Sequence, residues 1–243
     1  MTHPELSLVI PAYNEEALIV ATLDALHMYM QNRPETYEIV VVDDGSQDQT
    51  VNLVQAWQAR TGTDLQVLCN DRNMGKGYAI RHGILESRGQ SIIFIDADLP
   101  YELSAIERFM KALHAGADLA VGSRVLPGSQ VKGVPAYRFL SGQIFSVLVQ
   151  ALLFTGLPDT QCGFKAFKAA AAREIFRRVS IEGFGFDVEM LFVARKLRYK
   201  IQPVAVRMID HRQRSRVRLV RDSLIMFANL FMVRWKDWQG NYE

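Results

Sequence analysis

The chain has 243 residues, of which 49% are hydrophobic and 22% charged, a composition typical of a globular enzyme and compatible with one large domain. Its formal net charge of +2 is too small to indicate nucleic-acid binding, so an anionic partner must meet a local cluster of basic residues. Cys69 and Cys162 lie far apart without CxxC spacing, so neither a zinc site nor a disulfide framework is expected, and a reducing cytosolic compartment fits.

The first half of the sequence alternates short apolar runs, rich in β-branched residues, with longer segments of helical period. This alternation predicts an α/β fold with a parallel sheet and crossover helices. Helices are expected after Glu15, Ser46 and Gly77. A fourth is expected after Ser104-x-x-Glu107, a pattern able to cap a helix start. The predicted strands are Leu6–Pro11, Tyr37–Asp43, Leu65–Asn70, Ser91–Asp96 and Asp118–Ser123.

The second half of the sequence has a different spacing of elements, but no proline- or glycine-rich linker separates it from the first. We therefore expect a single domain over residues 1–243. The expected elements are a helix around Arg138–Leu153, a loop at Asp159–Phe164, helices near Lys168–Arg178 and Phe186–Lys196, a strand at Ile201–Met208 and a terminal helix from about Val217.

Two segments bear on the relation of the chain to membranes. The amino terminus enters an apolar strand directly, without the basic leader and apolar run of a signal peptide. The uncharged segment between Arg138 and Asp159 is interrupted by serine and glutamine residues, so a spanning helix is not expected there. Gln143, Ser146 and Gln150 share one helical face and apolar side chains cover the remainder, which suits a core or an interface.

Polar or glycine-bearing sequence follows each of the first four predicted strands. In open parallel sheets the ligand crevice lies outside the carboxyl ends of the strands, so four motifs are expected to converge on one edge. These motifs are PAYNE at 11–15, DDGS at 43–46, NDRNMGKG at 70–77 and DAD at 96–98.

Asp96 and Asp98 flank Ala97 at the end of the fourth predicted strand. Carboxylates in that position suit Mg²⁺, which commonly takes one or two protein carboxylates together with substrate phosphates. A departing diphosphate needs this neutralisation of charge while its bond to a sugar breaks. The alternative is a solvated acidic turn that caps the next helix. The other motif-bearing strand ends nearby favour the metal site.

Asp43 and Asp44 follow the second strand, where one of them is able to cap the next helix. Two adjacent acids exceed that need, and a carboxylate there can accept base N–H groups or ribose hydroxyls. Tyr13 offers a flat face for a nucleobase, although a buried core tyrosine is the ordinary alternative. Lys76 lies in a glycine-rich segment that opens a helix, so Lys76 and the backbone N–H groups around it are candidates for phosphate contact.

Taken together, the motifs resemble family-2 glycosyltransferases with the GT-A fold, and they match in order and spacing over about 125 residues. Farther on, the sequence resembles the branch of dolichyl-phosphate glucosyltransferases and dolichol-phosphate mannose synthases. The form DTQCGFK is closer to the glucosyl branch. The segments that carry this second resemblance are GSR at 122–124, DTQCGFK at 159–165 and GFDVE at 185–189.

The resemblance implies a GT-A nucleotide-diphospho-sugar transferase fold, with a mostly parallel central sheet flanked by helices. It implies an inverting hexosyltransferase that uses Mg²⁺ or Mn²⁺ and moves glucose from UDP-glucose to a polyprenyl phosphate, dolichyl or undecaprenyl. Residues 1–125 are then the nucleotide-sugar-binding half, and residues 126–243 the acceptor-side half with amphipathic helices. Mannosyl transfer from GDP-mannose, a soluble saccharide acceptor and a catalytically silent scaffold are the alternatives.

The resemblance also assigns roles to residues. Asp96 and Asp98 are the expected metal ligands, and Arg124 and Arg138 are expected to face the acceptor phosphate. Asp159, a catalytic candidate with Asp98, is expected near the transfer centre, although an anionic phosphate acceptor hardly needs a general base. The nucleoside is expected at Pro11, Tyr13, Glu15 and Asp43. The expected substrate-binding residues are Pro11, Ala12, Tyr13, Glu15, Asp43, Lys76, Asp96, Ala97, Arg124, Arg138, Lys165, Arg212, Ser215 and Arg216.

The sequence departs from the family pattern in two ways. Pro100 stands where the mannose synthases have a glutamine that helps hold the metal, which favours the glucosyl reading. Relatives of the glucosyl type often carry a transmembrane anchor, and none is visible here. We therefore expect a protein attached peripherally to the cytoplasmic face of a membrane, with a membrane-protein partner or a homo-oligomer left open.

An arginine-rich segment supports the peripheral attachment. Between Arg207 and Arg221 six arginines stand against one acid, Asp210, which gives a local net charge of +5. Each basic residue near an anionic bilayer contributes about 1 kcal/mol, so several together hold a protein at the headgroups. By the resemblance, residues 211–216 also help to grip donor or acceptor phosphate. A solvated cationic face is the alternative, and the last helix is expected either on the core or in lipid.

Overall fold

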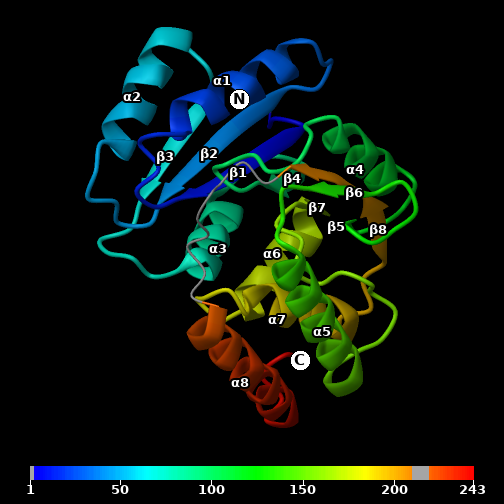
Figure 1. The fold of residues 1–243 in the computed structure, drawn as a ribbon. Helices are drawn as coiled ribbons and strands as arrows, with labels where there is room; N and C mark the ends of the chain where they lie inside the picture. Colours follow the sequence, from blue (N-terminus) through cyan, green and yellow to red (C-terminus); the bar gives the residue numbers. More distant parts are fainter. Residues whose placement is uncertain (1–2, 210–218) are drawn as a thin grey trace.

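A seven-stranded, mostly parallel sheet forms the centre of the protein, and Figure 1 shows its path through the molecule in the computed structural model, which describes residues 3–209 and 219–243. The strand order is β3-β2-β1-β4-β7-β5-β8, and β7 alone in this sheet runs antiparallel to its neighbours. The strands are β1 (Leu6–Ala12), β2 (Tyr37–Asp43), β3 (Leu65–Cys69), β4 (Ser91–Phe94), β5 (Leu119–Ser123), β7 (Lys165–Lys168) and β8 (Ile201–Ala205).

The inner strands have apolar side chains on both faces because helices cover both faces of the sheet. Every residue of β4 is buried, as are six of the seven residues in each of β1 and β2. Such strands read in the sequence as nearly continuous apolar runs. Their register aligns Leu6 with Tyr37 and with Ser91, so the carboxyl ends of β1, β2 and β4 meet at one edge. The predicted convergence of the strand-end motifs is therefore confirmed.

Two groups of helices bury the two faces of the sheet (Figure 1). One core cluster packs α1 (Ile19–Gln31), α2 (Thr50–Thr61) and α4 (Ala105–His114) on one face. The other cluster packs the remaining helices on the opposite face. These are α3 (Lys76–Glu86), α5 (Ala136–Leu152), α6 (Ala169–Arg178), α7 (Phe186–Lys196) and α8 (Leu219–Trp238).

The structure differs from the predicted elements around β7. The sequence predicts a loop followed by a helix there, but residues Lys165–Lys168 form a strand that hydrogen-bonds to β4 and β5. Two of these four residues are lysines, so the segment has no apolar run that predicts a strand. β7 forms because two buried neighbours supply backbone partners on both sides. A strand from the second half of the chain thus completes the sheet of the first half.

A small second sheet accounts for another difference. The predicted strand Ile201–Met208 is divided at Val206 into β8, in the large sheet, and β9 (Arg207–Ile209). β9 pairs in parallel with β6 (Gln130–Lys132), which the sequence analysis did not predict. Val206 donates its N–H to Ser123, while its carbonyl accepts from Gln130, so one residue joins both sheets.

Two predicted caps do not form. α2 begins at Thr50, whose N–H and hydroxyl both donate to Asp48 at 2.9 and 2.5 Å, so neither Asp43 nor Asp44 caps it. α4 begins after Ser104 as predicted, but the Ser104 side chain makes no capping hydrogen bond.

A buried carboxylate on α7 connects three parts of the chain. Glu189 is fully buried and accepts hydrogen bonds from the N–H groups of Ser180 and Ile181 at 2.8 and 2.7 Å. It also accepts one from the Tyr242 hydroxyl at 2.7 Å, and Lys236 of α8 lies 3.6 Å away. Because a buried charge requires such partners, Glu189 fixes the segment that follows α6 and the chain end that follows α8.

The segment held by Glu189 in turn supports the start of α3. The carbonyl of Glu182 accepts hydrogen bonds from the N–H groups of Gly77 at 2.6 Å and Tyr78 at 3.2 Å. These N–H groups belong to the first turn of α3, where a helix has no internal acceptors. The position of α3 therefore depends on α7 through this segment.

We expect Glu189→Ala to lower the free energy of unfolding by about 3 kcal/mol, because it leaves several buried donors without an acceptor. Urea denaturation monitored by circular dichroism measures the change. Glu182→Ala is the matched control, since the Glu182 side chain is exposed and only its carbonyl supports α3. The control should stay within about 0.5 kcal/mol of the parent. Equal stabilities of the two variants would contradict the assigned role of Glu189.

Candidate functional site

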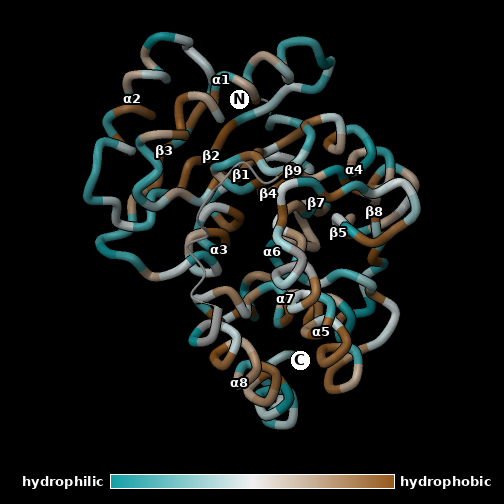
Figure 2. Tube along the Cα trace, in the orientation of Figure 1, coloured by the Kyte–Doolittle hydropathy of each residue, from teal (hydrophilic) through white to brown (hydrophobic). Residues whose placement is uncertain are grey.

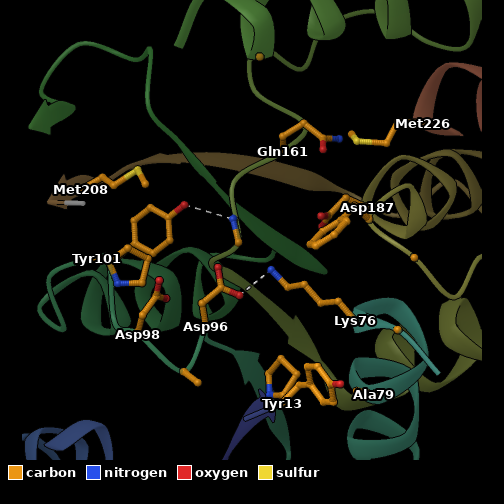
Figure 3. Close-up of a pocket in the computed structure, with 18 of the residues that line it drawn as sticks. Tyr13, Lys76, Ala79, Asp96, Asp98, Tyr101, Gln161, Asp187, Met208 and Met226 are labelled. Carbon is orange, nitrogen blue, oxygen red and sulfur yellow. Dashed lines mark hydrogen bonds and ion pairs between the residues drawn. The ribbon is translucent and has the colours of Figure 1, made fainter. Parts of the chain in front are cut away.

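A cavity of about 640 Å³ opens at the carboxyl edge of the sheet, and Figure 3 shows a close-up of it. The loops after β1, β2 and β4 form one side, the start of α3 forms another, and α5, α7 and α8 contribute residues from the second half of the sequence. Of the residues predicted as site residues, those that line the cavity are Pro11, Ala12, Tyr13, Glu15, Lys76, Asp96, Ala97, Asp98 and Arg124.

The structure places the other predicted residues outside the cavity or does not describe them. Asp43, Asp159 and Lys165 are buried behind the residues that line the cavity. Arg138 lies in α5, and its side chain is outside the described part of the structure. Arg212, Ser215 and Arg216, with most of the arginine-rich segment, lie in residues 210–218, which are not described.

The two predicted metal ligands lie in a tight turn that follows β4. The N–H of Leu99 donates to the carbonyl of Asp96 at 3.0 Å, and Leu99 has a φ of +43°. A non-glycine residue rarely adopts this left-handed conformation, so the surrounding structure must hold it. Both residues line the cavity, and Figure 3 labels the two side chains within it.

Gly163 makes room for the Asp96 carboxylate. A Cβ at Gly163 would collide with Asp96 Oδ2, and the Gly163 N–H donates to the hydroxyl of Tyr101 at 3.2 Å. Asp96 is therefore wedged between the start of α3 and the segment that leads into β7. Among the described residues no group of three or more acidic, histidine or cysteine side chains gathers as a metal site. The carboxylate oxygens of Asp96 and Asp98 are the donor type that Mg²⁺ takes when phosphate oxygens and water supply its other ligands.

Lys76 already pairs with one of these carboxylates. Its ammonium lies 2.5 Å from Asp96 Oδ1, as the dashed line in Figure 3 marks. Burial alone lowers the pKa of Lys76, but the charges of Asp96 and Asp187 outweigh burial and raise this pKa. Lys76 is therefore a permanent positive charge at the centre of the cavity wall.

Asp187 and Lys165 form a second ion pair behind Lys76. The ammonium of Lys165, which is fully buried, lies 2.5 Å from Asp187 Oδ1 and also donates to the carbonyl of Cys162. Burial raises the pKa of Asp187, and the charges of Lys165 and Lys76 only partly offset this effect. Lys165 was predicted to bind substrate, but its ammonium is held beneath the cavity, and Asp187 is the residue that lines it.

Asp43 offers an acceptor where the nucleoside is expected. Its Oδ2 accepts the N–H of Ser46 at 3.0 Å, whereas its Oδ1 is buried and has no hydrogen-bond partner among the described residues. Buried carboxylate oxygens are rarely left unpaired in folded proteins. An N–H or O–H group of a ligand would satisfy this oxygen, and Tyr13 lines the cavity close by along the same edge.

Asp44 fixes the loop that leads into α3. Its two carboxylate oxygens accept hydrogen bonds from the Asn70 side chain at 2.8 Å and from the N–H groups of Met74 and Gly75 at 2.9 and 2.8 Å. With the N–H groups of Gly77 and Tyr78 bound to a carbonyl, four N–H groups of this glycine-rich segment have protein acceptors. The expectation that these backbone groups meet a phosphate is therefore wrong for all four, and Lys76 is the group that faces the cavity.

Arg124 and Asp159 form a buried, two-point ion pair. Nε and one terminal nitrogen of Arg124 donate to the two carboxylate oxygens of Asp159 at 2.7 and 2.9 Å. The N–H groups of Arg124 and Gln161 occupy the same oxygens at 3.0 and 3.1 Å. Burial acts to raise the pKa of Asp159, but Arg124 outweighs burial and lowers this pKa. Asp159 is thus held as an acceptor of four hydrogen bonds.

Many residues that line the cavity were not among the predicted site residues, and these include Asp44, Tyr101, Gln161 and Asp187. Asp187 belongs to GFDVE, a motif that carried the resemblance, and Asp44 is adjacent to Asp43, so the sequence contained a signal for both. Gln161 lies within DTQCGFK, another motif that carried the resemblance, so the sequence contained a signal for it as well. Tyr101 follows DAD without belonging to a motif, and only the fold brings its side chain to the cavity.

Comparison with known proteins relates the whole arrangement to one family. The sequence matches the family model described as Glycosyl transferase family 2 over residues 7–176. It is 36% identical over 215 residues to the human protein named dolichyl-phosphate beta-glucosyltransferase, and the match covers 83% of this chain and 66% of that protein. The chain therefore spans slightly less than two thirds of that relative's length. The Saccharomyces cerevisiae protein of the same name is 32% identical over 264 residues, covering 98% of this chain and 76% of that protein.

The fold is similar to that of glucosyl-3-phosphoglycerate synthase from Mycobacterium tuberculosis, solved in complex with uridine diphosphate. The TM-score is 0.70 at 20% sequence identity, and the match covers 95% of this chain and 80% of that chain. This likeness confirms the predicted GT-A fold. Because the family model covers most of the chain and relatives exceed 30% identity, the chain belongs to glycosyltransferase family 2.

Proposed function

We propose that the protein transfers a hexose, with glucose from UDP-glucose as the leading donor, to the phosphate of a polyprenyl phosphate. The observation that carries the proposal is one cavity that holds the Asp96 and Asp98 carboxylates, Lys76 and Arg124 together. The names of the human and yeast relatives give the acceptor class and the sugar. In this proposal residues 1–125 supply most of the donor site, and residues 126–243 supply most of the acceptor side.

The donor site in this proposal follows the edge of the sheet. Tyr13 covers the base, and the unpaired Oδ1 of Asp43 accepts an N–H or hydroxyl group of the nucleoside. Asp96 and Asp98 would hold Mg²⁺ or Mn²⁺, and the synthase with the similar fold has been crystallised with Mg²⁺ or Mn²⁺ and uridine diphosphate. A bound divalent cation would neutralise charge on the departing diphosphate. Lys76 adds a fixed positive charge next to it.

The acceptor side is proposed at Arg124. Its guanidinium lines the cavity and is oriented by Asp159, so its remaining N–H groups can bind a phosphate oxygen. A phosphate acceptor is already anionic, and Asp159 has a lowered pKa with both oxygens occupied, which makes it a poor general base. We assign Asp159 the role of orienting Arg124. Arg138, Arg212, Ser215 and Arg216 stay proposed phosphate contacts.

A lipid acceptor requires contact with a membrane surface, and two helices at the cavity present suitable faces. α5 exposes apolar side chains at successive turns, and α8 does the same, as the brown segments of both helices in Figure 2 indicate. Arg234 of α8 donates to the carbonyls of Leu152 and Leu153 at the end of α5, so the two helices are joined. The exposed residues are Tyr137, Leu140, Ile144 and Val147 on α5, and Leu224, Ile225, Phe227, Phe231, Met232, Trp235 and Trp238 on α8.

Within the described residues, no helix combines the length and apolar character needed to cross a bilayer. We propose that the α5 and α8 faces enter the headgroup region, where amphipathic helices lie parallel to the membrane. Both helices also contribute residues to the cavity, so its opening would face the lipid. The cytoplasmic face is proposed because Cys69 and Cys162 are both free thiols.

Incubation of the purified protein with radiolabelled UDP-glucose, Mg²⁺ and a polyprenyl phosphate should move label into the organic phase. Asp98→Ala should lower this turnover at least about 100-fold, because a ligand to the leaving diphosphate is lost. Asp71→Ala is the control, since Asp71 is exposed and does not line the cavity. Label that stays in water with every nucleotide sugar tried would refute the proposed function.

Asp159→Asn should lower the free energy of unfolding by about 3 kcal/mol at neutral pH, because Arg124 loses its charged partner. The pKa of Asp159 lies below its unfolded value, so its contribution is fully present above that value and is lost as pH falls through the folded pKa. The difference between parent and variant should therefore be constant from about pH 8 to 5 and shrink below about pH 4. Urea titrations at several pH values measure it.

Asp71→Asn is the control for these titrations and should show no difference at any pH. A difference that instead grows as pH falls from about 7 to 5 would show that Asp159 takes up a proton near neutrality, because a raised folded pKa makes the parent more stable as pH falls. That result would restore Asp159 as a candidate general base.

The variant Ile144→Ser/Trp235→Ser should bind anionic phospholipid vesicles at least about tenfold more weakly, since it removes one large apolar side chain from each exposed face. Flotation with vesicles of phosphatidylcholine and phosphatidylglycerol measures the bound fraction. Met28→Ser is the matched control, because Met28 is 66% exposed on α1, a helix on the opposite face of the sheet. Equal binding of both variants would exclude α5 and α8 as the docking surface.

A further inference from the structure

Opposite charges alternate along the cavity wall from the core to the turn that follows β4. Lys165 pairs with Asp187, and Lys76 pairs with Asp96, each at 2.5 Å. In the view of Figure 3 the Lys76 ammonium lies between the carboxylates of Asp96 and Asp187, and its charge interacts with both. Lys76 therefore links the Lys165–Asp187 ion pair to Asp96, one of the two predicted metal ligands.

The position of Lys76 matters because it competes for a metal ligand. Asp96 Oδ1 is bound by the ammonium, and Gly163 closes the other side of the carboxylate at Oδ2. A divalent cation that approaches this carboxylate meets a fixed positive charge within a few ångströms, in a wall where burial strengthens repulsion. The side chains of Lys76 and Asp96 are 22% and 25% exposed, so water screens this repulsion only in part.

The charges immediately around Lys76 point the same way. Lys76 interacts with the carboxylates of Asp96, Asp98 and Asp187, and Asp187 pairs with Lys165, so this cluster of five groups has a net charge of about −1. A divalent cation alone would reverse the sign of this cluster. A cation that arrives with a nucleoside diphosphate brings little net charge, because the diphosphate neutralises it.

We propose that Lys76 is a resident counter-ion of Asp96 that opposes metal binding until a nucleoside diphosphate is present. When both ligands bind, the ammonium leaves Asp96 and is held by Asp187 and by the diphosphate. The side chain needs only to turn, since Lys76 is the first residue of α3 and its backbone is fixed by the contacts of Asp44 and Glu182. Metal affinity and nucleotide affinity are thereby coupled through one side chain.

This inference rests on the metal site of the proposed function, but it makes a separate prediction about affinity without catalysis. In the absence of nucleotide, Lys76→Met should bind Mn²⁺ about tenfold more tightly than the parent, because a charge-assisted interaction with Asp96 no longer has to be broken. Uridine diphosphate should increase the Mn²⁺ affinity of the parent strongly and that of Lys76→Met much less. Titration of free Mn²⁺ by electron paramagnetic resonance measures both affinities.

Two further variants separate charge from side-chain loss. Lys76→Arg keeps the charge and should keep the weak binding of Mn²⁺ alone. Lys111→Met removes an exposed positive charge on α4 and should leave the Mn²⁺ affinity unchanged. A gain of affinity cannot result from misfolding, so the expected change is distinguishable from damage to the fold.

The possible failures are distinct. If the parent binds Mn²⁺ only with uridine diphosphate, while Lys76→Met shows no tighter binding of Mn²⁺ alone, the counter-ion role is overturned and the proposed metal site stands. If the parent binds Mn²⁺ neither alone nor with uridine diphosphate, the metal site and the counter-ion role are both overturned.

Discussion

The arrangement of the site depends on the antiparallel pairing of β7 with β4. This pairing aligns Phe94 with Lys165, so the segment that precedes β7 must pass directly beside the turn that follows β4. Gly163 then lies against Asp96, and Asp159 lies where it can orient Arg124 at the end of β5. Without β7, Glu182 would still support the start of α3, but neither Gly163 nor Asp159 would be fixed beside the turns that follow β4 and β5.

The same constraint explains why so many charges are buried at this edge. Lys165 is the first residue of β7, and its side chain is fully buried. A buried ammonium group must have hydrogen-bond partners. Asp187 of α7 and the carbonyl of Cys162 supply them. Replacing buried ion pairs by apolar groups is often neutral or stabilising, so stability alone does not account for these charges. The alternation of positive and negative side chains along the cavity explains these buried charges better, because each charged side chain fixes the orientation of its neighbour.

The sequence predicts the first half of the fold well because its strands are buried on both faces. The run from Ile39 to Val42 and the run from Ile92 to Ile95 are apolar without interruption, and polar motifs mark where they end. β7 and β6 escape prediction because each is short and polar, and forms only through partners distant in the sequence. The site residues also divide into those that local sequence identifies and those that depend on tertiary packing. Motifs locate the strand ends, but which of two adjacent acids faces the ligand depends on packing.

Asp43 and Asp44 illustrate that dependence. Both follow β2 and both are buried, yet Asp44 satisfies three donors of the loop before α3, while Oδ1 of Asp43 has none among the described residues. Asp44 therefore builds the loop and lines the cavity, whereas Asp43 lies behind the cavity wall with one buried oxygen that has no partner among the described residues. Asp44 accepts the N–H of Gly75, the residue before Lys76, and Lys76 pairs with Asp96, so a short chain of contacts joins the loop after β2 to the turn after β4. The proposed nucleoside and cation sites lie at the two ends of this chain of contacts, which is why their occupancy is expected to be coupled.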